Sequence, residues 1–126
     1  KWTLPMDRLI YFAHWITPEL SPYRYDVRFF ATVAPEDQEA THDGIELTGN
    51  IWITPRHALA EYERDRFNMV LPTIMTLRDL DCFESIEAIL TAAAARNVHS
   101  ILTTVGERDG RLCEIMPDGK IFCPCL

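Results

Sequence analysis

Residues 9–16, LIYFAHWI, constrain the fold of this chain most strongly. They are apolar on both alternating faces except at His14. A strand with this pattern is covered on both sides, so we expect it inside a sheet with a layer on each face. Residues 24–33 alternate between two faces and predict a second strand. The connection, residues 17–23, contains two prolines, which predicts a fixed loop instead of a two-residue hairpin turn.

The middle of the chain predicts a loop, a strand and a helix in succession. Residues 34–44 are acidic and rich in turn formers, so we expect a surface loop. Residues 46–53 alternate and predict a third strand. Thr54 followed by Pro55 predicts the N-cap and the first position of a helix that runs to about residue 66.

Two more helices and a β-rich tail are predicted after residue 72. A short helix covers residues 73–80, and Asp81 with Glu84 has the form of a capping box for a further helix that stops near Asn97. The tail, residues 100–126, predicts short strands joined by turns at 106–110 and 117–119. Strands first, then helices, then a small β tail indicate an α/β (α+β) fold, with helices packed on a mixed or antiparallel sheet.

Composition excludes several classes of protein. The net charge of −7 argues against nucleic acid and anionic membranes as partners, because both select basic patches. No apolar run approaches the roughly 18 residues of a membrane span, and the first residues lack the pattern of a signal peptide. The chain starts without Met, which leaves processing or truncation before Lys1 open. Four cysteines are too few and too unevenly spread for a secreted disulfide framework, so we expect a reduced, cytoplasmic protein.

Two groups near the start of the chain each have a structural and a chemical interpretation. His14 is either a core histidine with one satisfied nitrogen or a catalytic base, although no Ser or Cys nucleophile motif accompanies it. Arg24, Asp26 and Arg28 form either a salt-bridged strand face or a clamp that contacts part of a long substrate.

Two further groups could bind metal. His42, Asp43 and Glu46 form either a solvated turn or part of a divalent-cation site. The tail cysteines are structural thiols, zinc ligands or redox groups, and their Cys-x-Cys spacing is shorter than in zinc knuckles; they are Cys113, Cys123 and Cys125. On residues alone, the chain contains no complete catalytic constellation.

Several segments together resemble the C-terminal half of a Nudix hydrolase domain, in the branch of the coenzyme A diphosphatases. The resemblance covers about residues 8–95. The segments that carry it are WITP (15–18), RYDVRFF (24–30), HDG (42–44) with Glu46, WITP (52–55), Ala58-Leu59 and LPTIMTLRDL (71–80).

The resemblance implies a fold and an activity. The fold is an α/β/α sandwich with a mixed β-sheet, in which residues 1–97 form the C-terminal part and residues 98–126 a short β-rich tail. The activity is hydrolysis of nucleoside diphosphate-linked compounds, with a coenzyme A-like substrate and Mg²⁺ or Mn²⁺ as cofactor. In this family Glu46 corresponds to a metal ligand or general base, and we take Arg24 and Arg28 as candidate substrate-binding residues.

The chain departs from the family at the catalytic motif. The Nudix signature, G-x5-E-x7-R-E-U-x-E-E-x-G-U with U aliphatic, is absent, and no Arg-Glu or Glu-Glu dipeptide occurs. The helix formed by this signature supplies the carboxylates that hold the metals. Three explanations are open: the C-terminal part of a longer Nudix protein, a split or degenerate domain that binds without hydrolysing, or an unrelated α+β binding module. The partners expected under the resemblance are a nucleoside diphosphate substrate, the N-terminal half of the domain or a partner chain, and a second copy in a homodimer.

Overall fold

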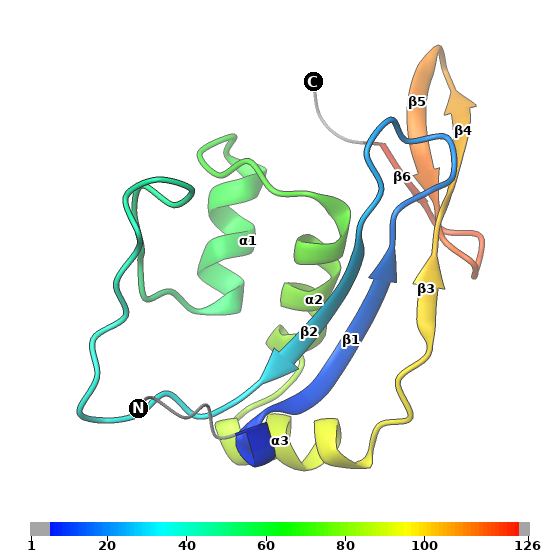
Figure 1. The fold of residues 1–126 in the computed structure, drawn as a ribbon. Coiled ribbons are helices and arrows are strands. Elements are labelled where there is room, and N and C mark those ends of the chain that lie inside the picture. The colour runs from blue at the N-terminus through cyan, green and yellow to red at the C-terminus, as the bar shows by residue number, and fades with distance from the viewer. Residues whose placement is uncertain (1–5, 124–126) are drawn as a thin grey trace. The chain divides into compact units, whose positions relative to one another are not determined.

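The computed structural model describes residues 6–123 (Figure 1). These residues form a mixed α+β fold with three α-helices, a 3-10 helix at Met6–Arg8 and two small sheets. They divide into two compact units: the first contains the described residues up to Ala31 and from Leu90 onward, and the second is Thr32–Ile89. No helix among the described residues is both long enough and apolar enough to cross a membrane.

Strand β1 (Ile10–Ile16) is the central strand of the first sheet. It pairs antiparallel with β2 (Asp26–Ala31) and parallel with β3 (Ser100–Leu102) (Figure 1). Its buried side chains include Phe12 and Trp15, which are 2% and 4% exposed. Both strands predicted from this end of the sequence are confirmed, although β2 starts two residues later and ends two residues earlier than expected.

The second sheet is antiparallel and comes from the predicted tail. Its strands, in spatial order, are β4 (Thr104–Arg108), β5 (Arg111–Ile115) and β6 (Ile121–Phe122). Asp109 and Gly110 connect β4 to β5 with φ values of 52° and 76°, the left-handed conformation that a two-residue hairpin turn requires. This turn is shorter than predicted, because the hairpin pairing extends up to it.

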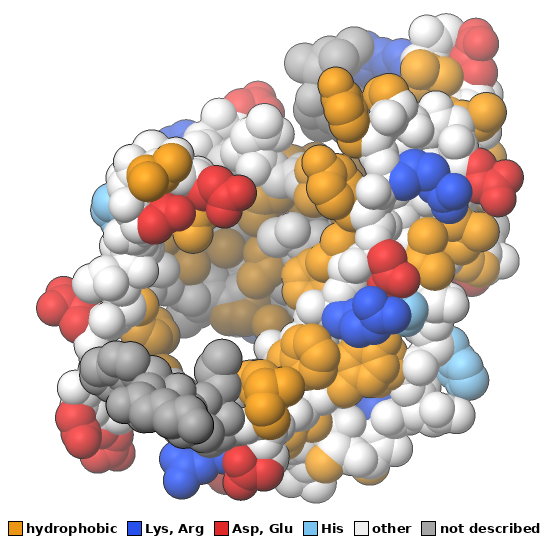
Figure 2. Space-filling model, in the orientation of Figure 1, with side chains coloured by type: hydrophobic (Ala, Val, Ile, Leu, Met, Phe, Trp, Pro, Cys, Tyr) orange, Lys and Arg blue, Asp and Glu red, His pale blue; other side chains and the backbone are white. Residues whose placement is uncertain are grey.

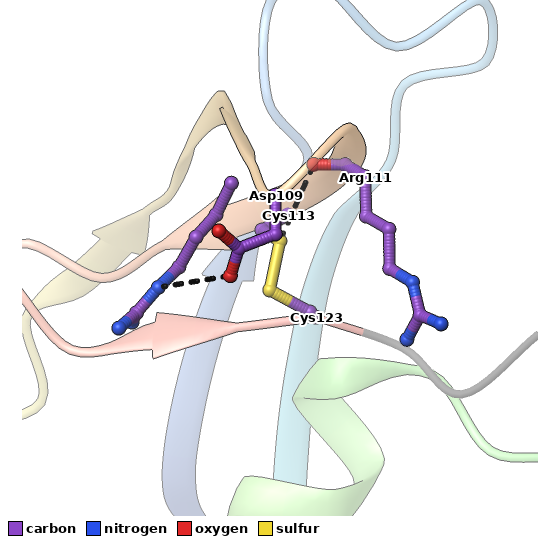
Figure 3. Close-up of a disulfide and its surroundings, with 5 residues drawn as sticks. Asp109, Arg111, Cys113 and Cys123 are labelled. Atoms are coloured by element: carbon purple, nitrogen blue, oxygen red, sulfur yellow. Dashed lines mark hydrogen bonds and ion pairs between the residues drawn. A yellow bond between two sulfur atoms is a disulfide. The ribbon is translucent and has the colours of Figure 1, made fainter.

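A disulfide joins Cys113 in β5 to Cys123, which directly follows β6 (Figure 3). The pairing of Glu114 with Phe122 places these cysteines opposite each other in the same antiparallel register. The tail cysteines were expected to be reduced, and this pair corrects that expectation. The predicted turn at residues 117–119 is confirmed between the two bridged strands. Cys125 lies outside the described residues.

Helices α1 (Pro55–Glu63) and α2 (Leu71–Asp81) pack against each other in the second unit. Their contact buries Ala58, Leu71 and Ile74, and Ile74 is completely inaccessible to solvent. Both helices were predicted, but α2 starts two residues earlier and ends one residue later than expected.

The predicted capping box at Asp81 and Glu84 is wrong. Asp81 is the last residue of α2, and the third helix, α3 (Ile86–Ala95), starts later. The hydroxyl of Ser85 accepts the amide hydrogen of Ala88 at 3.1 Å, so Ser85 caps this helix. The Asp-x-x-Glu pattern spans the junction of two helices instead of opening one.

The predicted strand at residues 46–53 is also wrong, because these residues form neither helix nor strand. The Asp43 carboxylate accepts the amide hydrogens of Ile45, Glu46 and Leu47 at 2.9–3.1 Å. Local side-chain acceptors of this kind compete with strand pairing. No other strand among the described residues lies alongside, so the alternating pattern remains unpaired. The exposed loop expected just before it, residues 34–44, is confirmed.

The cap of α1 gives a testable prediction. The Thr54 hydroxyl accepts the amide hydrogen of His57, as the sequence predicted. We expect Thr54→Ala to lower the free energy of unfolding by about 1 kcal/mol and Thr54→Ser to leave it nearly unchanged. Urea unfolding of both variants measures the difference. Equal stability of the two variants would contradict the capping role.

Candidate functional site

His14, Asp26 and Arg28 form an ion-paired group on the β1–β2 pair, which we call the Asp26 cluster. His14 Nε2 and Arg28 Nη1 lie 2.6 Å and 3.0 Å from the same oxygen of Asp26, Oδ1. The strand register explains the group: His14 is paired with Arg28, and Asp26 lies two residues earlier on the same face. Figure 2 shows acidic, basic and histidine side chains meeting on this face of the sheet.

The Asp26 carboxylate orients both of its neighbours. A neutral His14 ring donates its Nε2 hydrogen to Asp26 and presents Nδ1 as an acceptor, whereas a protonated ring donates from both nitrogens. Arg28 also directs Nη2 toward the second oxygen of Asp26, at 3.4 Å. One carboxylate therefore serves two basic groups, and the cluster is neutral until His14 is protonated.

Aromatic rings border His14 on the same strands. Tyr11 lies with its ring centroid 6.2 Å from that of His14 and 5.5 Å from that of Phe30 on β2. The His14 side chain is 14% exposed, while those of Asp26 and Arg28 are each 51% exposed. The structure thus contains the largely buried histidine with one satisfied nitrogen that the sequence predicted, and a role as catalytic base stays a prediction.

Arg24 lies outside strand β2, so it does not share a strand face with Arg28 as expected. It belongs to the connection between β1 and β2, where its Nε donates to the Thr17 carbonyl at 3.4 Å. Thr17 and Tyr25 close this connection, since the amide of each donates to the other residue at 3.0 Å. A substrate-binding role for both arginines stays a prediction, and the two belong to different local structures.

Glu46 and Asp43 differ in how their carboxylates are used. The amides of Leu47 and Ile45, followed by that of Glu46, hold the pKa of Asp43 below its usual value. The Glu46 carboxylate is exposed and has no partner among the described residues. Asp43 therefore serves the turn, and Glu46 is the available carboxylate of this loop.

The predicted site residues are divided between the two units of the structure. Glu46 belongs to the second unit, whereas Arg24 and Arg28 belong to the first. Within residues 6–123, no three or more His, Cys, Asp or Glu side chains are grouped to hold a metal ion. A cation site at His42, Asp43 and Glu46 stays a prediction.

A second ion-paired group, around Glu61 of α1, has no counterpart in the sequence analysis. Arg66 makes two hydrogen bonds to the Glu61 carboxylate, and Arg64 and His57 lie 3.3 Å and 3.5 Å from it. The hydrogen bonds and charge of Arg66, assisted by His57 and Arg64, lower the pKa of Glu61 from 4.5 to about 2. His57 and Arg64 stand four residues before and three after Glu61, a helical spacing that could have revealed the group.

The Asp26 cluster also contains a contact that the sequence did not reveal. The two arginines near Asp26 were considered as its partners, but His14 was treated separately. The signal lay in the strand pairing: once the 17–23 connection fixes the register, His14 faces the strand that carries Asp26. The register depends on the geometry of this connection, which the sequence predicts only as a fixed loop.

The comparisons with known proteins give no family. No family model matches the chain, and no curated protein or solved structure is significantly similar to it.

The Asp26 cluster predicts a stability effect. We expect Asp26→Asn to lower the free energy of unfolding by about 1 kcal/mol, because the amide cannot serve two basic groups as the half-exposed carboxylate does. Glu19→Gln, at an exposed carboxylate of the same unit, is the matched control. Chemical denaturation of both variants measures the effect, and equal stabilities would argue against a structural role for the cluster.

The Glu61 group predicts a pH dependence. Because the pKa of Glu61 is lower in the folded chain, the stabilisation is complete above pH 4.5 and is lost as the pH falls through about 2. We expect Glu61→Gln to be less stable than the parent chain at neutral pH, with a gap that narrows over this acid range. Denaturation at several pH values measures the gap. A gap that stays constant in acid would show that Glu61 is not ion-paired.

Proposed function

We propose that this chain is the C-terminal part of a Nudix-type α/β/α sandwich and belongs to a metal-dependent hydrolase of nucleoside diphosphate-linked compounds. In this reaction water attacks one phosphorus of the diphosphate, and the bond to the bridging oxygen breaks. A coenzyme A-like substrate is the class we favour. Mg²⁺ or Mn²⁺ would supply the positive charge that an acidic chain lacks when it binds a polyanion.

The observation that carries this proposal is the match between the resembling segments and their local structures. The first WITP segment and the RYDVRFF segment contribute to the neighbouring antiparallel strands β1 and β2, and a proline-containing connection joins them. The second WITP segment caps and opens α1 through Thr54 and Pro55. The order of strand, strand and capped helix supports the proposal of a shared fold.

The Asp26 cluster is the part of this chain best suited to hold an anionic group. Arg28 directs two of its five N–H donors toward Asp26, so the other donors are available for a phosphate oxygen. Asp26 holds the guanidinium in place, and a fixed guanidinium loses less freedom when it binds. His14, held by the same carboxylate, presents its Nδ1 for proton exchange.

Under this proposal, the chain supplies only part of the metal site. Mg²⁺ in enzymes of this kind is held by one or two carboxylates together with substrate phosphates and waters. Glu46 offers one exposed carboxylate, and the remaining ligands would come from the Nudix helix of the complete domain.

A non-catalytic Nudix-like binding or scaffold module is the second candidate function. The exposed apolar side chains of the loop between β2 and α1 favour it, because such side chains often mark interaction surfaces. We also propose a cytoplasmic location and a homodimer. The Cys113–Cys123 disulfide argues against the cytoplasmic location, since cytosolic proteins seldom keep structural disulfides.

The hydrolase proposal predicts an activity and a residue that supports it. With Mg²⁺ or Mn²⁺, the protein joined to its N-terminal half should cleave at least one member of a panel containing coenzyme A and dinucleotides, giving two phosphate-bearing products. We expect Glu46→Gln to slow this turnover by about tenfold or more without loss of stability. Product formation is followed by chromatography.

Glu39→Gln is the matched control, because Glu39 is an exposed carboxylate of the same loop. Equal rates for the two variants would remove Glu46 from the site. An absence of products across the whole panel would favour the binding module.

A further inference from the structure

Residues 33–53, which we call the acidic arm, expose an unusual number of large apolar side chains. The arm contains neither helix nor strand. Five of its large apolar side chains are between 56% and 88% exposed. Exposed apolar patches often mark interaction sites in soluble proteins. The five are Val33, Ile45, Leu47, Ile51 and Trp52.

Part of the backbone of the arm also lacks hydrogen-bond partners. The amides and carbonyls of residues 48–53 make no hydrogen bond within the part of the chain that the structure describes. Beyond the turn that the Asp43 carboxylate closes at Leu47, Leu47 and Ile51 project from one face of an extended chain, because side chains alternate with a period of two. Gly49 stands between them without a side chain and leaves space for a side chain from another segment. An added strand would satisfy the backbone and cover this face.

The charge of the arm specifies the chemistry of that strand. The arm carries five carboxylates, and no Lys or Arg occurs between Arg28 and Arg56. None of the four carboxylates other than Asp43 has a partner among the described residues. Uncompensated charge of one sign favours a partner of the opposite sign and repels other acidic chains. The carboxylates belong to Glu36, Asp37, Glu39, Asp43 and Glu46.

We propose that the acidic arm is a docking site for an extended segment of another polypeptide in which Lys or Arg alternates with apolar residues. The segment adds as a strand along residues 48–53. Its apolar side chains cover Leu47 and Ile51, which share one face, while its basic side chains are attracted to the carboxylates of the arm. This docking rests on the exposed arm alone and does not depend on the hydrolase activity.

Three synthetic peptides of about ten residues, the length of a long strand, test this docking on the intact chain. The first alternates Lys with Val, the second alternates Glu with Val, and the third has the composition of the first with all Lys residues before all Val residues. Calorimetric titration gives the affinities, and amide hydrogen exchange reports on residues 48–53. We expect the Lys-Val peptide to bind at least about tenfold more tightly than either other peptide, more weakly at high salt, and to slow exchange at residues 48–53.

Two pairs of variants distinguish peptide binding at the acidic arm from nonspecific effects of substitutions elsewhere on the chain. Charge reversal of Glu36, Asp37 and Glu39 to Lys should weaken binding by about tenfold, whereas the same reversal of the exposed carboxylates Glu63, Glu84 and Glu107 should change it far less. In the Ile51→Asp variant, the Lys-Val peptide should no longer slow amide exchange at residues 48–53. Leu112→Asp is its control, because Leu112 is equally exposed but lies in β5.

Several results would overturn the docking proposal. Slow exchange at residues 48–53 in the chain alone would show that the arm is already paired. Equal affinities for the Lys-Val and Glu-Val peptides, or equal effects of the two charge reversals, would show that basic side chains of the partner do not bind the carboxylates of the arm. Equal affinities for the two Lys peptides would show that the alternation of Lys with Val is not recognised. Sedimentation that shows a dimer in the parent chain but not in Ile51→Asp would assign the arm to a second copy instead.

Discussion

The first unit depends on the double pairing of β1. This strand is buried, and it is bonded on one edge to β2 and on the other to β3, which comes from a distant part of the sequence. A buried strand must satisfy its amides and carbonyls along both edges, because each unpaired group costs free energy. The chain must therefore leave the sheet after β2 and return at Ser100 to complete it. The Asp26 cluster follows from the same pairing, since the β1–β2 register places His14 beside Asp26.

Local signals predicted much of the fold, and long-range partners explain what they missed. The apolar run of β1, the prolines after it and the Thr54 cap each act within a few residues, so the sequence revealed them. Residues 46–53 have a strand pattern but no neighbouring strand within residues 6–123, and a pattern cannot supply a partner. The cap of α3 was misplaced because Asp81 could equally end one helix or begin the next. For the site, the sequence named Arg28 and Glu46 but could not show that they lie in separate units.

The carboxylates of the described chain fall into two kinds. Asp26, Glu61 and Asp43 are engaged by basic side chains or backbone amides, and the last two have lowered pKa values as a result. Glu46 and its neighbours at 36, 37 and 39 face solvent without a partner among residues 6–123. Engaged carboxylates hold the structure together, whereas free ones are available to a cation or a basic chain. Both the hydrolase proposal and the docking proposal draw on this second kind.

The central structural claim is that β1 has a partner on each side, while β2 is paired on one edge only among the described residues. Residue-resolved amide hydrogen exchange tests it most directly. The account predicts slow exchange along β1 and an alternating pattern along β2, in which amides directed at β1 are protected and those directed at the open edge exchange quickly. Uniform protection along β2 would contradict the account, because it would show that another strand covers that edge.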